Sequence, residues 1–541
     1  MSMRFYLLFV LSFFLLPAAV AQKVWPAPLI LTPEKTAFQK TSTCQEVSSF
    51  LDAISTLSSE VKIVSLGKSH EGKDIQMAIL SRNGIATPAA AKKSQKAIAY
   101  VQGNIHAGEV EGKEALMMLM RDILLGNKNH LLDSLIVLFV PAYNTDSNDK
   151  MEKGRRPSQE DSPMEVGIRE NSQGWDLNRD GVKQEAVETR ALFSSVLNTW
   201  DPHVFVDLHT TNGTWHAYSL TWAPGYLSSG NSSVYQYTND QMLRTITRHM
   251  REKYDLRTGP YGDYDLREGW PPKNFYTYNH HPRYLINQLG LRNRIAILSE
   301  AFAHERFYQR IYSTYSFVTE ILDYTQQHAH EIMRVTQTAD QETVHKFATQ
   351  AGQAKAGVQF KMVSGEVINK FRTYDYAGAK KDDGTMEWFR TGNIVQYDSV
   401  QYFAQFHATV ESTIPRGYII PAAHSVLALH LQQLGIHVTK LSKGKTMKGD
   451  VFQITKLQRS ARKFEGHLMA TAEGTFEKTS RKFQAGDYMV DLAQPLGNLA
   501  FYVLEPQSDD GFITWNFLDR YLEKAGMNNH TVEYPVFKYY N

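Results

Sequence analysis

The segment that decides the fold is AIAYVQGNIHAGE, residues 97–109. Its first half, Ala97–Gln102, has the length and apolar character of a buried β-strand. Its second half, Gly103–Glu109, carries a histidine and a glutamate and follows the strand directly. In open α/β sheets the functional groups gather where the strands end. We therefore expect His106 and Glu109 to lie at the carboxyl end of a strand.

Other apolar runs end in polar residues in the same way. They are Leu135–Val140, Val204–Leu208 and Ile295–Leu298, followed by Pro141–Asp149, His209–Gly213 and Ser299–Ala303. Between Ala97–Gln102 and Leu135–Val140, the segment Gly112–Leu125 carries apolar residues at helical spacing. Strands that alternate with helices predict an α/β fold with a mixed, mostly parallel central sheet flanked by helices.

A region of different character follows this alternating pattern. Arg310–Val335 predicts a long closing helix, and the polar residues after it predict a connecting segment. Val358–Tyr402 has alternating, strand-like segments, and His424–Leu434 predicts an amphipathic helix. We expect a first domain at residues 22–335, a linker at 336–355 and a smaller α/β or β-rich C-terminal domain of unknown role at 356–541.

The N-terminus has the pattern of a secretory signal peptide. Arg4 precedes the apolar stretch Phe5–Leu16, and Ala19-Val20-Ala21 fits the small-residue cleavage motif. We expect cleavage after Ala21, so that residues 1–21 are the signal peptide. The apolar stretch is short for a bilayer, and no later stretch reaches the roughly 18 apolar residues of a membrane span. The sequence predicts an exported protein, periplasmic or extracellular, without membrane attachment after cleavage.

Composition narrows the class of protein and the kind of site. The 541 residues include 58 Lys and Arg against 56 Asp and Glu, which gives a formal net charge of +2. This balance argues against a nucleic-acid partner, since neutralising phosphates needs a basic excess. The single cysteine, Cys44, excludes an intrachain disulfide and any cysteine-based zinc cluster. A bound metal would have to be held by carboxylates and by some of the 19 histidines.

His106 and Glu109 are three residues apart in a predicted turn, where both can contact one metal ion. The motif alone is weak, because three other His-x-x-Glu pairs occur in the chain, none directly after an apolar strand. His209, at the end of its own strand, is the third candidate ligand, and a core histidine is the alternative for that residue taken alone. Two His and one Glu with a water in the fourth position form the open coordination of a catalytic zinc.

Glu300 stands at the end of the last apolar run. A carboxylate there is costly to bury without a partner or a role, so it is either a general base or a structural ion pair. The polar segment Gly167–Asp180 supplies Arg169, Asn178 and Arg179. Arginine side chains bind carboxylates and stabilise oxyanions, although any one of these residues fits a solvated loop equally well. Together, beside a zinc site, they suggest a substrate that carries a carboxylate.

Taken in chain order, these residues resemble the zinc carboxypeptidases, the relatives of carboxypeptidase A and of carboxypeptidase E/D. The family pattern is His-x-x-Glu, then Arg, an Asn-Arg pair, a lone His and a Glu. The segment Gly174–Asp180 (GWDLNRD) is the most specific match, and Leu66–Asp74 resembles an early turn of the family. The resemblance covers about residues 25–330 and indicates a secreted bacterial member with a C-terminal extension.

The resemblance implies a function and a role for each residue. One Zn²⁺ ion would be bound by His106, Glu109 and His209. Glu300 would act on a zinc-activated water as general base and then as acid, Arg169 would polarise the scissile carbonyl, and Asn178 and Arg179 would hold the substrate's C-terminal carboxylate. The family's mobile capping tyrosine is assigned to Tyr278, with Tyr276 and Tyr284 as nearby alternatives. The expected protein is a metallocarboxypeptidase whose partner is a peptide or protein with a free C-terminal carboxylate.

Other functions stay open on the sequence. A peptidoglycan stem-peptide amidase or endopeptidase would use the same site, and deacylases of small acylated amino acids share the zinc ligands. An inactive peptide- or glycan-binding protein would not need the whole set of residues. Zinc content, together with release of free amino acids from a mixed peptide pool, separates the carboxypeptidase, the amidase and the inactive protein.

Overall fold

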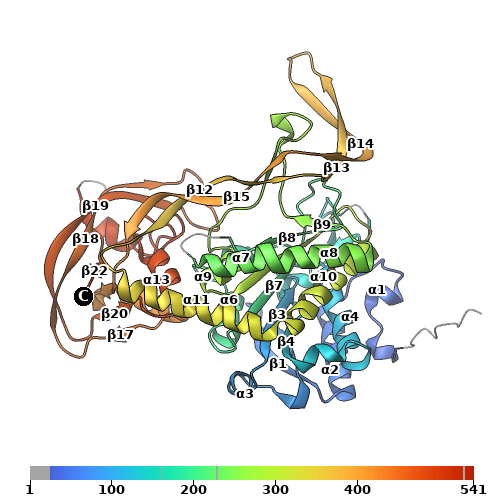
Figure 1. Cartoon of the computed structure of the whole chain (residues 1–541), viewed down its shortest axis with the longest axis horizontal. Helices are drawn as coiled ribbons and strands as arrows, with labels where there is room; N and C mark the ends of the chain where they lie inside the picture. The colour runs from blue at the N-terminus through green and yellow to red at the C-terminus, as the bar shows by residue number, and fades with distance from the viewer. Residues whose placement is uncertain (1–24, 160, 227–229, 528–529) are drawn as a thin grey trace, which may run out of the picture.

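The structure, a computed structural model, describes residues 25–159, 161–226, 230–527 and 530–541. The predicted signal peptide at residues 1–21 lies outside them. The largest element is an eight-stranded sheet (Figure 1). In spatial order its strands are β1 (Val61–Lys68), β2 (Asp74–Leu80), β4 (Leu135–Val140), β3 (Ala97–Gly103), β7 (Val204–Thr210), β11 (Ile295–Ala301), β8 (Leu220–Pro224) and β9 (Thr258–Pro260).

The strands at the centre of this sheet are parallel. β4, β3, β7 and β11 all run in one direction. β1 and β2 are antiparallel to their neighbours at one side, and β8 is antiparallel to β11 at the other. The predicted mixed, mostly parallel sheet is confirmed.

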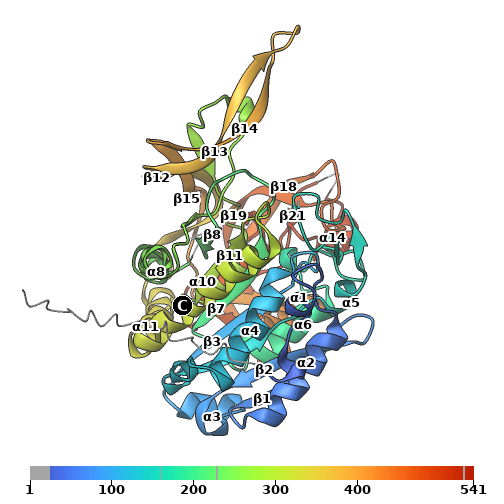
Figure 2. The ribbon, with the colours of Figure 1, turned by 90° about the vertical axis from the view of Figure 1, so that its right-hand side faces the viewer.

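Successive residues of a strand point to opposite faces of the sheet. Both faces carry apolar side chains here, and helices cover both of them. In β3, Ile98 and Tyr100 enter one hydrophobic core, whereas Ala99 and Val101 enter the other. In Figure 2, α4 and α10 lie in front of the central strands. The helices of this part are α1 (Thr32–Lys35), α2 (Cys44–Leu57), α3 (Pro88–Lys93), α4 (Glu111–Leu125), α5 (Thr145–Asn148), α6 (Val187–Leu192), α7 (Ser232–Gln236), α8 (Arg244–Tyr254), α9 (Leu285–Leu291), α10 (Phe307–Gln327) and α11 (Ala329–Thr349).

The prediction of a single closing helix at residues 310–335 is wrong. Two helices, α10 and α11, occupy this stretch and meet at His328, whose φ of −111° and ψ of 21° interrupt the helical backbone. The apolar spacing continues through both helices, so the sequence pattern does not reveal the break. The segment predicted as a linker, 336–355, contains the second half of α11 and leads into β12 (Lys355–Ile368).

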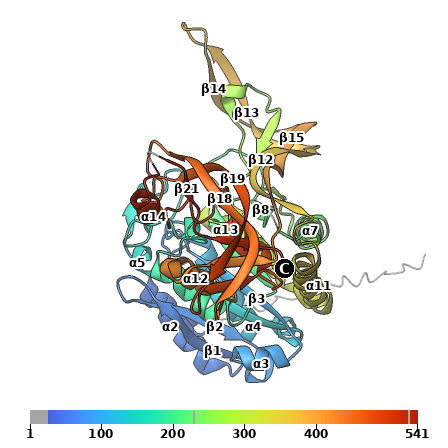
Figure 3. The same cartoon turned by 90° about the vertical axis from the view of Figure 1, so that its left-hand side faces the viewer.

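The C-terminal region is rich in strands, as predicted (Figure 3). One sheet contains β16 (Gly417–Ile420), β17 (Thr439–Lys440), β18 (Lys445–Arg459), β19 (Ala470–Phe483), β20 (Tyr488–Asp491), β21 (Val532–Glu533) and β22 (Phe537–Tyr539). The hairpin of β13 (Phe371–Lys380) and β14 (Met386–Tyr397) projects from the body of the molecule (Figures 1 and 2). The helices are α12 (Ser425–Gln433), α13 (Gly497–Leu504) and α14 (Asp519–Lys524), and a short pair β5 (Glu152–Lys153) and β6 (Glu165–Val166) lies in the first part.

The two parts of the chain are joined by a shared sheet and a shared core. β10 (Asn274–Tyr276) of the first part pairs with β15 (Val400–Thr413), which also pairs with β12. One hydrophobic cluster contains Leu285 of the first part and Phe512 of the C-terminal region. We keep residues 336–355 as the proposed boundary. Within the described ranges, the helices are all too short or too polar to cross a membrane.

Candidate active site

His106 and Glu109 lie in a tight turn between β3 and α4. Asn104 starts the turn with a φ of +65°, in the left-handed region that asparagine tolerates. Its Nδ2 donates hydrogen bonds to the carbonyl oxygens of Ala107 and Glu109, at 3.1 and 3.3 Å. The Glu109 amide also donates to the carbonyl of His106, at 2.9 Å. The turn therefore places both side chains at the carboxyl end of β3, as predicted.

His209 and Glu300 lie side by side on neighbouring strands. β7 and β11 are parallel, and in their register His209 is opposite Glu300. Residues paired in this way point to the same face of the sheet. Two residues 91 positions apart in sequence are thus brought together by strand register alone.

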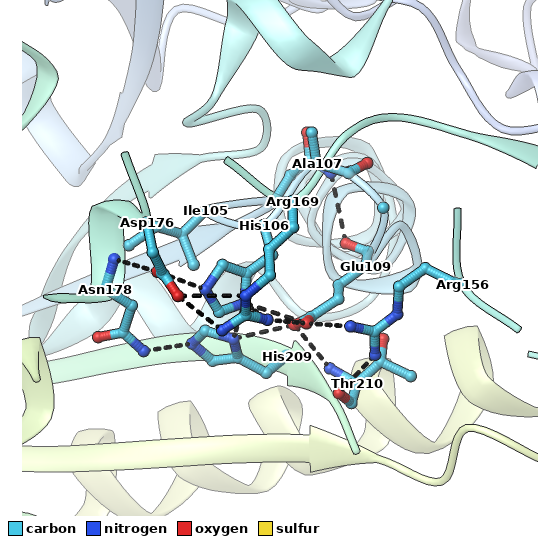
Figure 4. A network of polar contacts seen from close by, with 12 residues as sticks. Ile105, His106, Ala107, Glu109, Arg156, Arg169, Asp176, Asn178, His209 and Thr210 are labelled. Carbon is cyan, nitrogen blue, oxygen red and sulfur yellow. Dashed lines mark hydrogen bonds and ion pairs between the residues drawn. The ribbon is translucent and has the colours of Figure 1, made fainter. Parts of the chain in front are cut away.

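The side chains of His106, Glu109 and His209 converge on one point (Figure 4). His106 Nδ1 lies 3.0 Å from Glu109 Oε1, His209 Nδ1 lies 2.9 Å from Glu109 Oε2, and the two Nδ1 atoms are 3.2 Å apart. Donor atoms around a tetrahedral zinc ion at 2.0–2.1 Å are about 3.3 Å from each other. All three side chains are buried, and both their spacing and their chemistry fit a zinc ion.

Each histidine is oriented from behind by a carboxylate. Asp176 Oδ1 lies 3.0 Å from His106 Nε2, and Asp207 Oδ2 lies 2.9 Å from His209 Nε2. Carboxylates in this position fix the ring and its tautomer, leaving the Nδ1 atom for a metal. Neither residue was predicted from the sequence. Asp207 does carry a signal, since it is a charged residue inside the buried strand β7, and Asp176 lies within the GWDLNRD segment.

Arginine side chains surround the carboxylate of Glu109 (Figure 4). Arg169 Nη1 lies 3.3 Å from Glu109 Oε1, while its Nε and Nη2 donate to Asp176 Oδ2 at 3.1 and 2.8 Å. Arg156 was not predicted, and nothing in its polar sequence context distinguishes it. Its Nη1 donates to Glu109 Oε1 at 2.8 Å, and its Nη2 donates to the carbonyl of Thr210 at 3.0 Å.

A cavity of about 430 Å³ opens onto this cluster. Arg179 lies 4.4 Å above the ring of Tyr284, and the Tyr278 ring packs 5.1 Å from the same tyrosine. Apolar and aromatic side chains, Ile286, Leu298 and Tyr261, form much of the remaining wall. The structure brings all eight residues predicted for the site into this cavity: His106, Glu109, Arg169, Asn178, Arg179, His209, Tyr278 and Glu300.

Burial and nearby charges have opposite effects on the pKa values of the titratable groups of the site. Burial opposes ionisation of Glu109, but His106 and Arg156 outweigh it and hold its pKa well below the ordinary value. The same balance, with His106, Arg179 and Arg169 as partners, keeps the pKa of Asp176 well below normal. For His209, burial lowers the pKa, but Asp207 and Glu109 raise it well above 6.5.

The pKa of Glu300 is shifted in the opposite direction to that of Glu109. Burial is the main influence and raises its pKa from 4.5 to about 8, although His209 opposes the shift. Its Oε2 atom is buried and has no hydrogen-bond partner within the part of the chain that the structure describes. Glu300 therefore offers the cavity an oxygen that can exchange a proton near neutral pH.

The C-terminal region reaches the site through the loop between β18 and β19. Glu465 Oε2 accepts a hydrogen bond from the amide of Asp176, at 3.1 Å. In the same loop, His467 Nε2 lies 3.0 Å from Glu185 Oε1. Asp176 is the residue that orients His106, so the C-terminal region supports the candidate ligands indirectly. This contact was not predicted from the sequence.

Comparison with known proteins shows which family the part of the chain that forms this site resembles. The family model described as zinc carboxypeptidase, Peptidase_M14, matches residues 47–281. The matched part of this chain belongs to the zinc carboxypeptidase family. It is accordingly a hydrolase of the metallopeptidase class. The match includes His106, Glu109, Arg169, Asn178, Arg179, His209 and Tyr278. It ends before Glu300, whose place in the site comes from strand register.

Individual relatives are distant but extend over most of the chain. Carboxypeptidase 2 of Trichophyton tonsurans is 22% identical over 478 residues, which cover 83% of this chain and 79% of the relative. Carboxypeptidase 2 of Trichophyton rubrum is 20% identical over 494 residues, which cover 87% and 81%. Among solved structures, a metallo-carboxypeptidase from Burkholderia cenocepacia has a TM-score of 0.39 and 14% identity, covering 53% of this chain and 70% of that one.

Proposed function

We propose that this family member is a zinc metallocarboxypeptidase that removes residues from the C-terminus of peptides. The observation that carries the proposal is the cavity in which the candidate metal ligands, the buried carboxylate of Glu300 and cationic side chains meet. The carboxypeptidases among its relatives support the same activity. The substrate is a peptide or protein with a free C-terminal carboxylate.

One zinc ion is proposed to be held by His106 Nδ1, His209 Nδ1 and the carboxylate of Glu109. Asp176 and Asp207 support this set, because each carboxylate lies within 3.0 Å of a histidine Nε2 atom and so leaves the Nδ1 atom facing Glu109. Bound zinc polarises a carbonyl group and lowers the pKa of a coordinated water.

Glu300 is proposed as the general base and then the general acid. Its buried Oε2 atom accepts a proton from water during attack on the scissile carbonyl, and the same carboxyl group later donates that proton to the leaving amine. Burial supports the second half of this cycle, because it raises the pKa of Glu300 to about 8 and so stabilises the protonated form.

The arginines are proposed to bind and stabilise negative charge on the substrate. Arg169, next to Glu109, donates hydrogen bonds to the oxygen that becomes negative in the tetrahedral intermediate. Asn178 and Arg179 bind the terminal carboxylate, and Arg179 already stacks on Tyr284 at the cavity wall. Tyr278 closes the cavity over the bound C-terminal residue. Orientation by these groups determines how near to the chain end cleavage occurs.

The role of Glu300 is tested by the isosteric variant Glu300→Gln. We expect it to retain the wild-type amount of zinc but to lose hydrolysis of a blocked peptide. Glu252→Gln, an exposed residue of α8, is the matched control and should behave as wild type. Retained peptidase activity in Glu300→Gln would show that another group is the base, whereas loss of zinc would make Glu300 a ligand.

We also propose export to the periplasm or the exterior of the cell. The proposal is supported by the sequence of residues 1–21, with its single arginine, apolar stretch and small-residue cleavage motif. N-terminal sequencing of protein recovered outside the cytoplasm should begin at Gln22. A chain that keeps residues 1–21 and stays with the cytoplasmic fraction would refute it.

A further inference from the structure

A second group of candidate metal ligands lies where the first part of the chain meets the C-terminal region. It consists of His280, His281 and Asp509, whose donor atoms all lie within 4.8 Å of one another. The two histidines follow β10, and Asp509 follows α13. None of them is among the residues that line the catalytic cavity. This cluster is therefore separate from the site described above.

His280 is a buried imidazole that lies beside a carboxylate. Its side chain is 1% exposed, and its ring packs between Phe360 and Phe406, with both centroids 4.9 Å away. Among the described residues, neither of its ring nitrogens has a hydrogen-bond partner. Its Nε2 nevertheless lies 3.3 Å from Asp509 Oδ2. Leaving buried polar atoms unpaired is costly, so this arrangement calls for a ligand between the two groups.

Asp509 is held in position by contacts that do not involve His280. Its Oδ1 accepts a hydrogen bond from the hydroxyl of Tyr502, and its Oδ2 accepts one from the amide of Phe360 at 3.0 Å. The amide of Asp509 donates to the carbonyl of Val358, at 3.0 Å. A carboxylate fixed in this way is preorganised, because an ion that binds it need not order the side chain.

The remaining neighbours allow a cation at this place. The ring of His281 is half-buried and its centroid lies 4.6 Å from that of His280, close enough to supply a third donor. Arg283 is the nearby cationic side chain, but Asp510 pairs with it through Nε and Nη2, at 2.8 and 2.7 Å. The positive charge of Arg283 is thus neutralised locally and does not oppose binding.

We propose that His280, His281 and Asp509 bind a second zinc ion. Two imidazoles and one carboxylate suit zinc, whereas calcium and magnesium prefer oxygen ligands. The 3.3 Å between His280 Nε2 and Asp509 Oδ2 already matches the spacing of about 3.3 Å around tetrahedral zinc. Rotation of the half-buried His281 ring brings in the third donor. The ion links the segment that carries Tyr278 and Tyr284 to the C-terminal region.

The test counts metal ions and needs no activity, so it does not depend on the proposed peptidase function. Full-length protein is stripped with a chelator and titrated with Zn²⁺ against a chromophoric competitor. We expect wild type to bind a second equivalent, and His106→Gln/His209→Gln, which lacks the active-site imidazoles, to bind one. Adding Asp509→Asn to that variant should abolish the remaining binding and its zinc-dependent rise in Tm.

Two further variants make the result decisive. His281→Gln, at a half-buried position, replaces Asp509→Asn if the latter does not fold, and it should remove the same equivalent. His437→Gln, at an exposed position of the C-terminal region, is the matched control and should leave the count unchanged. Failure of His106→Gln/His209→Gln to bind any zinc would overturn the proposal. So would an equivalent that survives both Asp509→Asn and His281→Gln.

Discussion

Replacement of Glu300 by glutamine should stabilise the metal-free protein, and the gain should grow with pH. The carboxyl group of Glu300 has a pKa near 4.5 when exposed, and burial raises that pKa to about 8 in the folded chain. Between these values Glu300 binds more protons in the folded state than in the unfolded state, so its contribution to wild-type stability falls as pH rises. Glutamine is neutral in both states and removes this fall.

The size of the effect follows from the two pKa values. Since one pKa unit corresponds to about 1.4 kcal/mol, the advantage of Glu300→Gln should be about 1 kcal/mol at pH 5 and about 4 kcal/mol at pH 8. Loading with zinc should reduce it, because a nearby cation favours the ionised carboxylate.

The assay is urea denaturation of chelator-treated protein at several pH values, with Glu252→Gln as an exposed control. The control should follow the wild-type profile at each pH. Parallel profiles for Glu300→Gln and wild type would show that Glu300 is not a desolvated acid. A variant less stable than wild type at pH 8 would refute the reasoning altogether.

Three other substitutions test separate parts of the site and of the domain contact. Arg179→Ala should slow hydrolysis of peptides with a free C-terminal carboxylate roughly 10–100-fold, since a hydrogen bond to a charged group contributes about 1.5–3 kcal/mol; an equal loss on C-terminal amides would argue for an endopeptidase. Asp176→Asn should weaken zinc binding about 10–100-fold in competition with a chelator, through loss of its contact with His106. Unchanged zinc affinity would remove Asp176 from the metal's support. Asp510→Ala leaves the buried Arg283 unpaired and should lower the free energy of unfolding by about 3–5 kcal/mol in denaturant melts. A change below about 1 kcal/mol would show that this pair does not hold the two parts together.

The sequence predicted those site residues that carry a local signal. His106 and Glu109 follow an apolar run within one turn, and Glu300 is a carboxylate at a buried strand end. Their convergence could be anticipated because parallel strands end at the same edge of a sheet. Asn178, Arg179 and Arg169 stood out through the GWDLNRD segment and its resemblance to a known pattern. The sheet itself was predictable from the alternation of strands and helices.

Contacts made over long sequence distances could not be predicted in this way. Arg156 reaches Glu109 from a polar loop, and Glu465 reaches Asp176 from the C-terminal region 289 residues away. The first contact depends on the path of a polar loop and the second on how the two parts of the chain pack, and neither leaves a periodic pattern in the sequence. The break at His328 was hidden for a related reason, because helical spacing is the same on both sides of it.

The most direct test of the central claim follows hydrolysis by the zinc-loaded protein at the end of a peptide. An N-terminally blocked peptide and its C-terminal amide are incubated in parallel, and released products are identified by mass spectrometry. The account predicts that free amino acids leave the first peptide one at a time from its C-terminus, that the amide is hydrolysed far more slowly, and that chelation stops both reactions. Cleavage at internal bonds, or equal rates on the acid and the amide, would contradict it.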